Sequence, residues 1–213
     1  MLDLQIRALG AVGAAGLLAL AAWAPALAED HASLVLTPSQ AEGPYYPVEI
    51  PEDRDADLTV VDGSDEVAGG DVLELSGVLL REDGTALEGA TVEIWQTDAL
   101  GVYLHPADPG YDDRDSAFQG FGTSLTDAEG AWAFRTILPE LYGSRPRHSH
   151  AKVKVDDETV LTTQIYFSGG DIPAEGALEE TGTELDALLV KVRAVDDEDG
   201  ARILTAEHTL VLP

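Results

Sequence analysis

The sequence predicts an all-β fold, an antiparallel β-sandwich with long loops that carry the active site. Short segments in which apolar and polar residues alternate recur along the chain, and they are rich in β-branched and aromatic residues. Turn sequences rich in Asp and Gly separate these segments, as at Arg81–Gly84 and Thr126–Gly130. About seven or eight short strands joined by such turns are typical of two sheets packed face to face.

The expected strands follow the period of two in chain order. The first begins near Asp71 and continues to Leu80, where Val72, Glu74, Ser76 and Val78 alternate with leucines. The segment 100–125 has little periodicity, and long ordered loops on a β scaffold often carry functional residues. The remaining strands are expected at 90–96, 131–136, 151–155, 160–167, 185–195 and 203–212, and a short helix also fits the pattern within 178–189.

Residues 1–28 have the pattern of a secretory signal peptide. Arg7 is followed by an apolar run from Ala8 to Ala24, and Ala26-Leu27-Ala28 is a small-residue cleavage site. A membrane anchor is the alternative, but the run of about 17 residues is at the lower limit for a spanning helix. We therefore expect cleavage near Ala28 and export to the periplasm or the extracellular medium.

The remaining chain is expected to form one domain. Residues 29–70, rich in Pro, Gly and Asp from 43 to 66, are interpreted as an N-terminal arm that contributes to the pocket, and residues 71–213 as the sandwich core. The chain contains no cysteine. This excludes disulfides, thiolate metal sites and cysteine nucleophiles, so packing or a bound metal must stabilise the fold.

The chain is strongly acidic, with 40 Asp and Glu against 12 Lys and Arg and a net charge of −28. This charge repels phosphate backbones and anionic lipid headgroups, so neither a nucleic acid nor a membrane is an expected partner. A surface of this kind keeps a protein soluble, and salt screens its self-repulsion. An anionic substrate would approach against this field unless nearby arginines offset it.

A His-x-His pair lies at the start of an expected strand. On a strand, His148 and His150 would project from the same face about 6.5–7 Å apart, which lets both reach one metal ion. Tyr142 and Arg145 lie close before them, and Pro146 restricts the entry to the strand. Taken alone, the pair would also fit two surface histidines or a copper or zinc site.

A second segment, Glu93-Ile94-Trp95-Gln96, leads from a strand into a loop that presents Tyr103 and His105. Taken alone, Tyr103 would be an ordinary half-buried loop residue. Together and in this order, however, the segments resemble the intradiol ring-cleavage dioxygenases, the family of protocatechuate and catechol dioxygenases. The resemblance runs from about Thr37 to Asp171 and rests on Thr37–Gln40, Gly43–Tyr46, Glu93–Gln96, Gly101–His105, Phe118–Gly120, Thr126-Asp127, Phe134–Ile137, Pro139, Tyr142, Arg145, His148–His150 and Thr162–Phe167.

The resemblance implies one Fe(III) ion per chain, bound by two tyrosinates and two imidazoles. Arg145 corresponds to the active-site arginine of the family and Gln164 to the glutamine behind the ligands; the catalytic set also includes Tyr142, the axial tyrosinate. Gly43, Pro44 and Tyr45 correspond to the wall of the substrate pocket. The implied metal ligands are Tyr103, Tyr142, His148 and His150.

The implied reaction cleaves a catechol-type ring between its two hydroxylated carbons with O2 and gives a cis,cis-muconate-type product. The residue types agree, because ferric iron favours anionic oxygen donors and a bound cation can deprotonate a phenol whose pKa is otherwise about 10. A ferrous site with two histidines and one carboxylate would need an Asp or Glu at a ligand position, and these motifs place none there. The oligomeric state, including a homo-oligomer, and the identity of the catechol are left open.

Two features limit the resemblance. Ser149 stands between the two histidines where the family usually has a bulky aliphatic residue, which leaves the ligands intact but reduces packing behind them. The strand pattern from Ser76 to Glu93 is also typical of transthyretin-like domains, many of which catalyse nothing. A non-catalytic binding module is therefore the competing hypothesis.

Overall fold

The structure is a computed structural model that describes residues 34–173, 185–196 and 200–213. The chain divides into two units, Met1–Asp30 and His31–Pro213, and every described residue belongs to the second. The expected signal peptide and its cleavage site therefore lie outside the described residues. Within the described ranges, no helix combines the length and the apolar character needed to cross a membrane.

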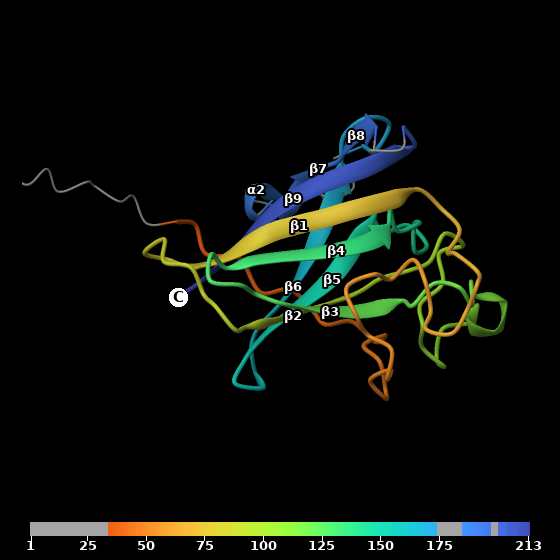
Figure 1. Cartoon of the computed structure of the whole chain (residues 1–213), viewed down its shortest axis with the longest axis horizontal. Helices are drawn as coiled ribbons and strands as arrows, with labels where there is room; N and C mark the ends of the chain where they lie inside the picture. The colour runs from red at the N-terminus through yellow and green to blue at the C-terminus, as the bar shows by residue number, and fades with distance from the viewer. Residues whose placement is uncertain (1–33, 174–184, 197–199) are drawn as a thin grey trace, which may run out of the picture. The chain divides into compact units, whose positions relative to one another are not determined.

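The second unit is a β-sandwich, as the sequence predicts (Figure 1). One sheet has the strand order β4-β1-β9-β8 and the other the order β3-β2-β5-β6-β7. Helical structure is limited, in the described part of the chain, to the 3-10 turn Tyr111–Asp113 and the single turn α2, Leu185–Leu188. The strands are β1 (Val72–Arg81), β2 (Thr91–Trp95), β3 (Phe121–Leu125), β4 (Ala131–Ile137), β5 (His148–Val155), β6 (Glu158–Ser168), β7 (Leu189–Lys191), β8 (Arg193–Asp196) and β9 (Arg202–Leu212).

Both sheets are mixed rather than purely antiparallel. β1 pairs with β4 in the antiparallel sense but with β9 in parallel, and β6 pairs with β7 in parallel. The last strand thus lies between the first strand and β8. Local periodicity predicts that a segment is a strand, but it does not determine which distant strand lies beside it or in which direction.

Alternation along the strands places the core between the sheets. Leu73, Leu75 and Leu79 of β1 are fully buried, and so are Ala151 and Val153 of β5. All five belong to one apolar cluster with residues of both sheets. The other face of β5 therefore points away from this core, and that face carries the histidines.

Two expected elements differ from the structure, and one strand of the structure was not expected. β5 begins at His148 rather than at Ala151. The segment 185–195 is not one strand: it forms the helical turn α2 and the strands β7 and β8, and these two strands belong to different sheets. β3 was not expected. Its Gly122 is required because a Cβ there would lie 2.6 Å from the Asp55 carbonyl oxygen, and such a glycine obscures the strand pattern.

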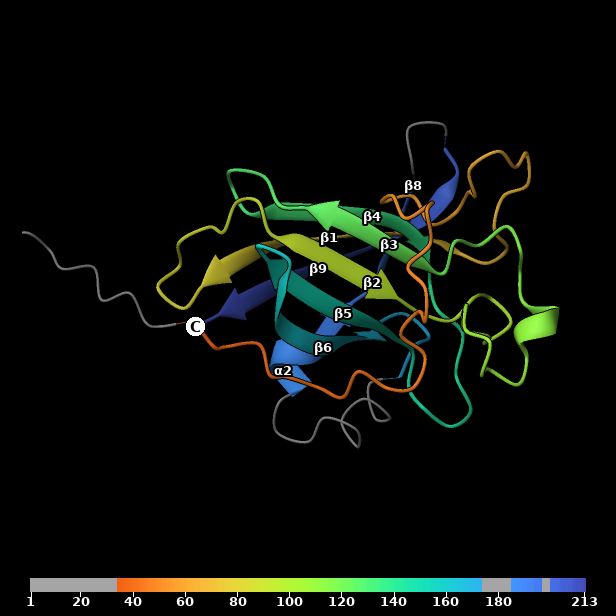
Figure 2. The same cartoon turned by 90° about the horizontal axis from the view of Figure 1, so that it is seen from below.

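The N-terminal arm crosses the outer face of the β2-β5-β6 sheet. Figure 2 shows this segment in orange along β6 and then across the ends of the strands, where the loops around 96–120 and 138–147 also lie. The Gln40 amide donates to the Thr162 carbonyl (2.9 Å), and the Thr123 amide donates to the Arg54 carbonyl (2.8 Å). The arm therefore replaces solvent on a face that an open sheet would leave exposed.

Candidate metal and substrate site

Strand β5 places His148 and His150 on its outer face, as expected from their spacing. Both residues are 3% exposed, and their ring centroids lie 5.0 Å apart. His150 is the register partner of Trp95 on β2 and of Gln164 on β6. The two rings thus meet at the first residues of a central strand, next to the loops that close that end of the sheet.

Tyr103 reaches the histidines from the loop after β2. Its backbone forms a bridge with Thr97, and its amide donates to Asp108 Oδ2 at 3.0 Å. Its phenol oxygen lies 3.1 Å from His148 Nε2, and its ring lies 5.9 Å from the ring of His150. The loop turns at Asp98, so the local hydrogen bonds fix where this buried tyrosine points.

Tyr142 completes the group from the loop between β4 and β5. Its ring centroid lies 5.3 Å from that of Tyr103, and its hydroxyl forms a hydrogen bond with the hydroxyl of Tyr45. Tyr142 is half-buried whereas Tyr103 is 2% exposed. The structure therefore brings together all four residues that the sequence singles out as ligands.

The tautomer of His148 leaves one nitrogen directed at this group. His148 Nδ1 donates to the Pro146 carbonyl at 2.7 Å, so Nε2 carries the lone pair. An Nδ1–H bonded to a backbone carbonyl is the arrangement that orients metal-binding histidines. In the described part of the chain, buried His150 Nδ1 has no hydrogen-bond partner, and its ring stacks on Trp95 at 4.9 Å and 10°.

Burial, and for Tyr142 a hydrogen bond, keep all four groups neutral until a cation binds. It lowers the pKa of His148 to about 4 and that of His150 to about 2, so both imidazoles are unprotonated at neutral pH. Burial also raises the pKa of Tyr103, and the hydrogen bond to Tyr45 raises that of Tyr142 to about 12. A nearby cation is needed to turn these phenols into phenolates.

Arg145 links His148 to Gln164. One guanidinium nitrogen lies 2.9 Å from His148 Nε2, and the other donates to Gln164 Oε1 at 2.7 Å. The amide nitrogen of Gln164 donates to the Ala41 carbonyl of the arm at 2.8 Å. Tyr166 also donates to Gln164 Oε1 at 3.1 Å. The side chain of Gln164 thus orients the arginine and joins it to the arm.

The expected pocket wall lies against the same group. Tyr45 stacks on Tyr103 with ring centroids 4.9 Å apart and an interplanar angle of 25°. Gly43 approaches His150 so closely that a Cβ would lie 3.2 Å from the ring carbon Cε1. Pro44 lies between them and is exposed. His105, which is not expected to be a ligand, contacts Tyr45 edge-on at 5.6 Å.

A cavity of about 390 Å³ opens beside Arg145. A second cavity, of about 810 Å³, is lined by residues of β1, β3, β4 and β9, and none of the donor groups lines it. Proximity to the donors makes the smaller cavity the relevant one. Its lining is formed by Leu141, Gly143, Ser144, Arg145, Pro146, Arg147, Asp171, Ile172 and Pro173.

Among the residues that the structure describes, no metal site is built from histidines and carboxylates alone. No three His, Asp or Glu side chains there are grouped so that they could hold one ion. The site must therefore be built with tyrosines if it binds a metal. Sequence reasoning named Trp95 only as part of the motif Glu93–Gln96 and assigned it no role, because its contact with His150 depends on the pairing of β2 with β5. The register of the two strands is the signal that would have found this contact.

Comparison with known proteins finds the same family that the motifs resemble. A family model described as "Dioxygenase" matches residues 41–212. The chain is 34% identical to the protocatechuate 3,4-dioxygenase beta chain of Burkholderia cepacia over 180 residues, 79% of this chain and 77% of that one. It is also 34% identical to catechol 1,2-dioxygenase of Acinetobacter baylyi over 151 residues, 62% of this chain and 47% of the relative. The chain belongs to the intradiol ring-cleavage dioxygenase family.

Solved structures show the same fold. The dioxygenase domain of a dioxygenase carbohydrate-binding protein fusion from Streptomyces sp. SirexAA-E superposes with a TM-score of 0.59 at 30% identity, covering 84% of this chain and all of that one. Catechol 1,2-dioxygenase from Acinetobacter sp. ADP1 gives 0.60 at 28% identity, covering 83% and 62%. The chain spans about half the length of the catechol 1,2-dioxygenases it matches.

Proposed function

We propose that the chain is an Fe(III)-dependent intradiol dioxygenase that cleaves catechol-type rings between the two hydroxylated carbons with O2. The observation that carries this proposal is the convergence of Tyr103 and Tyr142 with two neutral imidazoles, those of His148 and His150. Two phenolates offset most of the charge of a trivalent ion, and imidazoles complete its coordination. A carboxylate-free set of this kind suits ferric iron better than Mg²⁺ or Ca²⁺.

Iron held by these four groups would supply Lewis-acid and template chemistry, fixing both catechol oxygens and drawing electron density from the ring. The protein groups divide the remaining tasks. Tyr142 is the less buried phenol, and its hydroxyl is hydrogen-bonded to that of Tyr45. Its oxygen, as a phenolate, is therefore placed to take a proton from a substrate hydroxyl. Arg145 is placed to stabilise negative charge that develops on the substrate, because its guanidinium is already oriented by Gln164.

Small uncharged or weakly charged catechols suit this site best. The relatives' names include catechol, chlorocatechol and protocatechuate dioxygenases. Arg145 and Arg147 line the adjacent cavity, but the chain as a whole carries a charge of −28. An anionic substrate is therefore drawn in only at short range. We further infer that the enzyme acts after export and cleavage near Ala28, where it would meet catechols of its surroundings.

The metal and its ligands are tested by colour and by two substitutions. Ferric iron bound to tyrosinate gives a red-brown charge-transfer band, which zinc would not give. Tyr103→Phe and Tyr142→Phe should each shift or remove this band because each deletes one phenolate. Tyr111→Phe is the matched control, since Tyr111 packs on Arg114 in the 3-10 turn and contacts none of the four groups. A band that both ligand variants leave unchanged would refute the ligand set.

The reaction is tested by oxygen uptake of the iron-loaded protein with a panel of catechols, followed by product analysis. A cis,cis-muconate-type product identifies intradiol cleavage. Product from cleavage outside the two hydroxylated carbons would contradict the proposal. Absence of oxygen uptake with every dihydroxybenzene would favour the alternative, a non-catalytic transthyretin-like binding module.

A further inference from the structure

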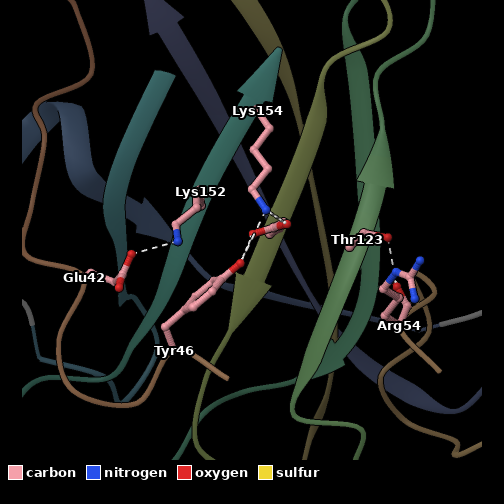
Figure 3. Close-up of polar contacts among 7 residues, drawn as sticks. Glu42, Tyr46, Arg54, Thr123, Lys152 and Lys154 are labelled. Atoms are coloured by element: carbon pink, nitrogen blue, oxygen red, sulfur yellow. Dashed lines mark hydrogen bonds and ion pairs between the residues drawn. The ribbon is translucent and has the colours of Figure 1, made fainter. Parts of the chain in front are cut away.

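Lys152 is a buried lysine that lies two residues beyond His150 on the same face of β5. The residue is 6% exposed, and its ammonium lies 2.7 Å from Glu42 Oε2 of the arm. The same nitrogen lies 3.3 Å from the ring centroid of Tyr46 and 5.6 Å from that of Trp95. Figure 3 shows Lys152 extending from its strand toward Glu42, with Tyr46 beside it.

These contacts differ from those of an ordinary surface ion pair. Exposed pairs contribute little because water screens them, whereas a lysine is almost never buried unless its charge is paired. Here the lysine side chain is 8% exposed and that of Glu42 is 48% exposed. The arm and the two aromatic rings therefore provide the environment that stabilises the ammonium, and the ammonium in turn holds the arm on the sheet.

Glu42 and Tyr46 immediately flank the pocket wall, Gly43-Pro44-Tyr45. One ammonium thus contacts the residue before the wall and the residue after it. The hydroxyl of Tyr46 donates to Glu93 Oε2 at 2.8 Å, and Lys154 forms an ion pair with the other Glu93 oxygen at 2.5 Å. Both ends of the three-residue wall are therefore tied to the sheet, and the wall itself has little freedom to move relative to His150.

We propose that Lys152 is a positioning residue that sets the wall 43–45 against the metal ligands and thereby determines how tightly substrate binds. It contacts neither the four donor groups nor the cavity, so it acts through Glu42, Tyr46 and Trp95. The part of this inference that concerns substrate rests on the proposed function. The part that concerns the arm does not.

Lys152→Met tests the inference because methionine keeps the length of the side chain but removes its charge. The released Glu42 carboxylate is already half exposed, so no buried charge is stranded and the variant should fold. We expect backbone amides of residues 40–46 to exchange hydrogen on the order of tenfold faster, the change produced by a loss of 1.4 kcal/mol in local stability. Amides of β1 and β9 should keep their wild-type rates.

The catalytic readout separates positioning from general damage. For the iron-loaded enzyme we expect the KM for catechol to rise about tenfold while kcat stays within about threefold, since a loosened wall weakens binding more than chemistry. Lys152→Arg should restore most of both readouts because it keeps the charge. Lys191→Met, an exposed lysine on β7, is the control with the same change in net charge, and it should leave both readouts unchanged.

The hydrogen-exchange and kinetic results test separate parts of the inference. Wild-type exchange at residues 40–46 in Lys152→Met, or faster exchange spread equally over β1 and β9, would overturn the inference. A kcat that falls as far as kcat/KM would also overturn it, because the lysine would then act on the chemical step. If the wild-type protein binds no iron or cleaves no catechol, the proposed function fails, and the exchange experiment still decides whether Lys152 holds the arm.

Discussion

Gly43 shows how closely the backbone of the arm approaches a ligand ring. Its φ is +73°, a conformation that residues with a side chain rarely adopt, and an added Cβ would lie 3.2 Å from His150 Cε1. A glycine here meets two requirements: the positive φ of the turn and the short distance to the His150 ring. The two can be separated, because Gly63 has a similar φ of +79° with no atom within 4 Å of its added Cβ.

Gly43→Ala should therefore do more than Gly63→Ala. Each substitution costs about 1 kcal/mol of stability for the left-handed backbone. Gly43→Ala should in addition move the ring of His150 or the arm, which weakens metal binding and shifts the tyrosinate band. Urea unfolding and iron titration measure the two effects. Equal behaviour of the two variants in the iron titration would show that the wall does not constrain His150.

The sequence points to the four candidate ligands but not to the residues that hold them in place. Tyr103, Tyr142, His148 and His150 stand out because few residue types bind metals and their order in the chain is informative. Lys152 does not stand out, and Trp95 enters only as one residue of a motif, because an aromatic residue and a lysine on a strand have many ordinary explanations. Their significance depends on the pairing of β2 with β5 and on the path of the arm, which local sequence does not encode.

At the scale of elements, β1 depends on a glycine at its centre. Gly77 is the register partner of Trp132 on β4 and of His208 on β9. The Trp132 ring lies over it, so an added Cβ would be 2.5 Å from a ring carbon, and the His208 carbonyl oxygen would be closer still. The neighbouring strands on both sides of β1 thus pack directly against the backbone of Gly77.

Gly77→Ala should destabilise the fold by about 3 kcal/mol or more, since overpacking a core of this kind forces the backbone or the ring to move. Gly84→Ala in the turn after β1 is the control: its φ is +84° and its added Cβ meets no atom within 4 Å. It should cost about 1 kcal/mol. Chemical denaturation of both metal-free variants gives the comparison, and a Gly77→Ala protein as stable as wild type would contradict the described packing.

The elements themselves followed from the sequence where one face of a strand is buried and the other is not. β1, β4 and β9 alternate, and their positions were predicted. β2 was also predicted, at 90–96, whereas the start of β5 was missed. Both are buried on both faces because the arm covers the outer one. The parallel pairing of β1 with β9 joins the first strand to the last, and no local pattern reports it.

For the whole molecule, the charge of −28 and the buried histidines set the response to pH. Self-repulsion among the carboxylates opposes the compact state, and salt at about 0.5 M shortens the screening length enough to remove most of it. What remains is the titration of groups whose pKa differs between the folded and unfolded chain. His148, His150 and His208 all have a lowered pKa in the folded protein, so they act in the same direction.

His208 gives the cleanest test because it lies on β9, in the sheet that carries none of the donor groups. Burial lowers its pKa to about 4 from the 6.5 of an exposed histidine. Between these values the unfolded chain binds the proton and the folded chain does not, so stability falls as the pH drops from 6.5 to 4. At 1.36 kcal/mol per pKa unit, this one residue accounts for about 3 kcal/mol at full extent. Metal-free wild type and His208→Gln, unfolded with urea from pH 7 to pH 4 in 0.5 M NaCl, should therefore diverge, with wild type losing more; two parallel stability curves would show that His208 is protonated as readily in the folded protein as outside it.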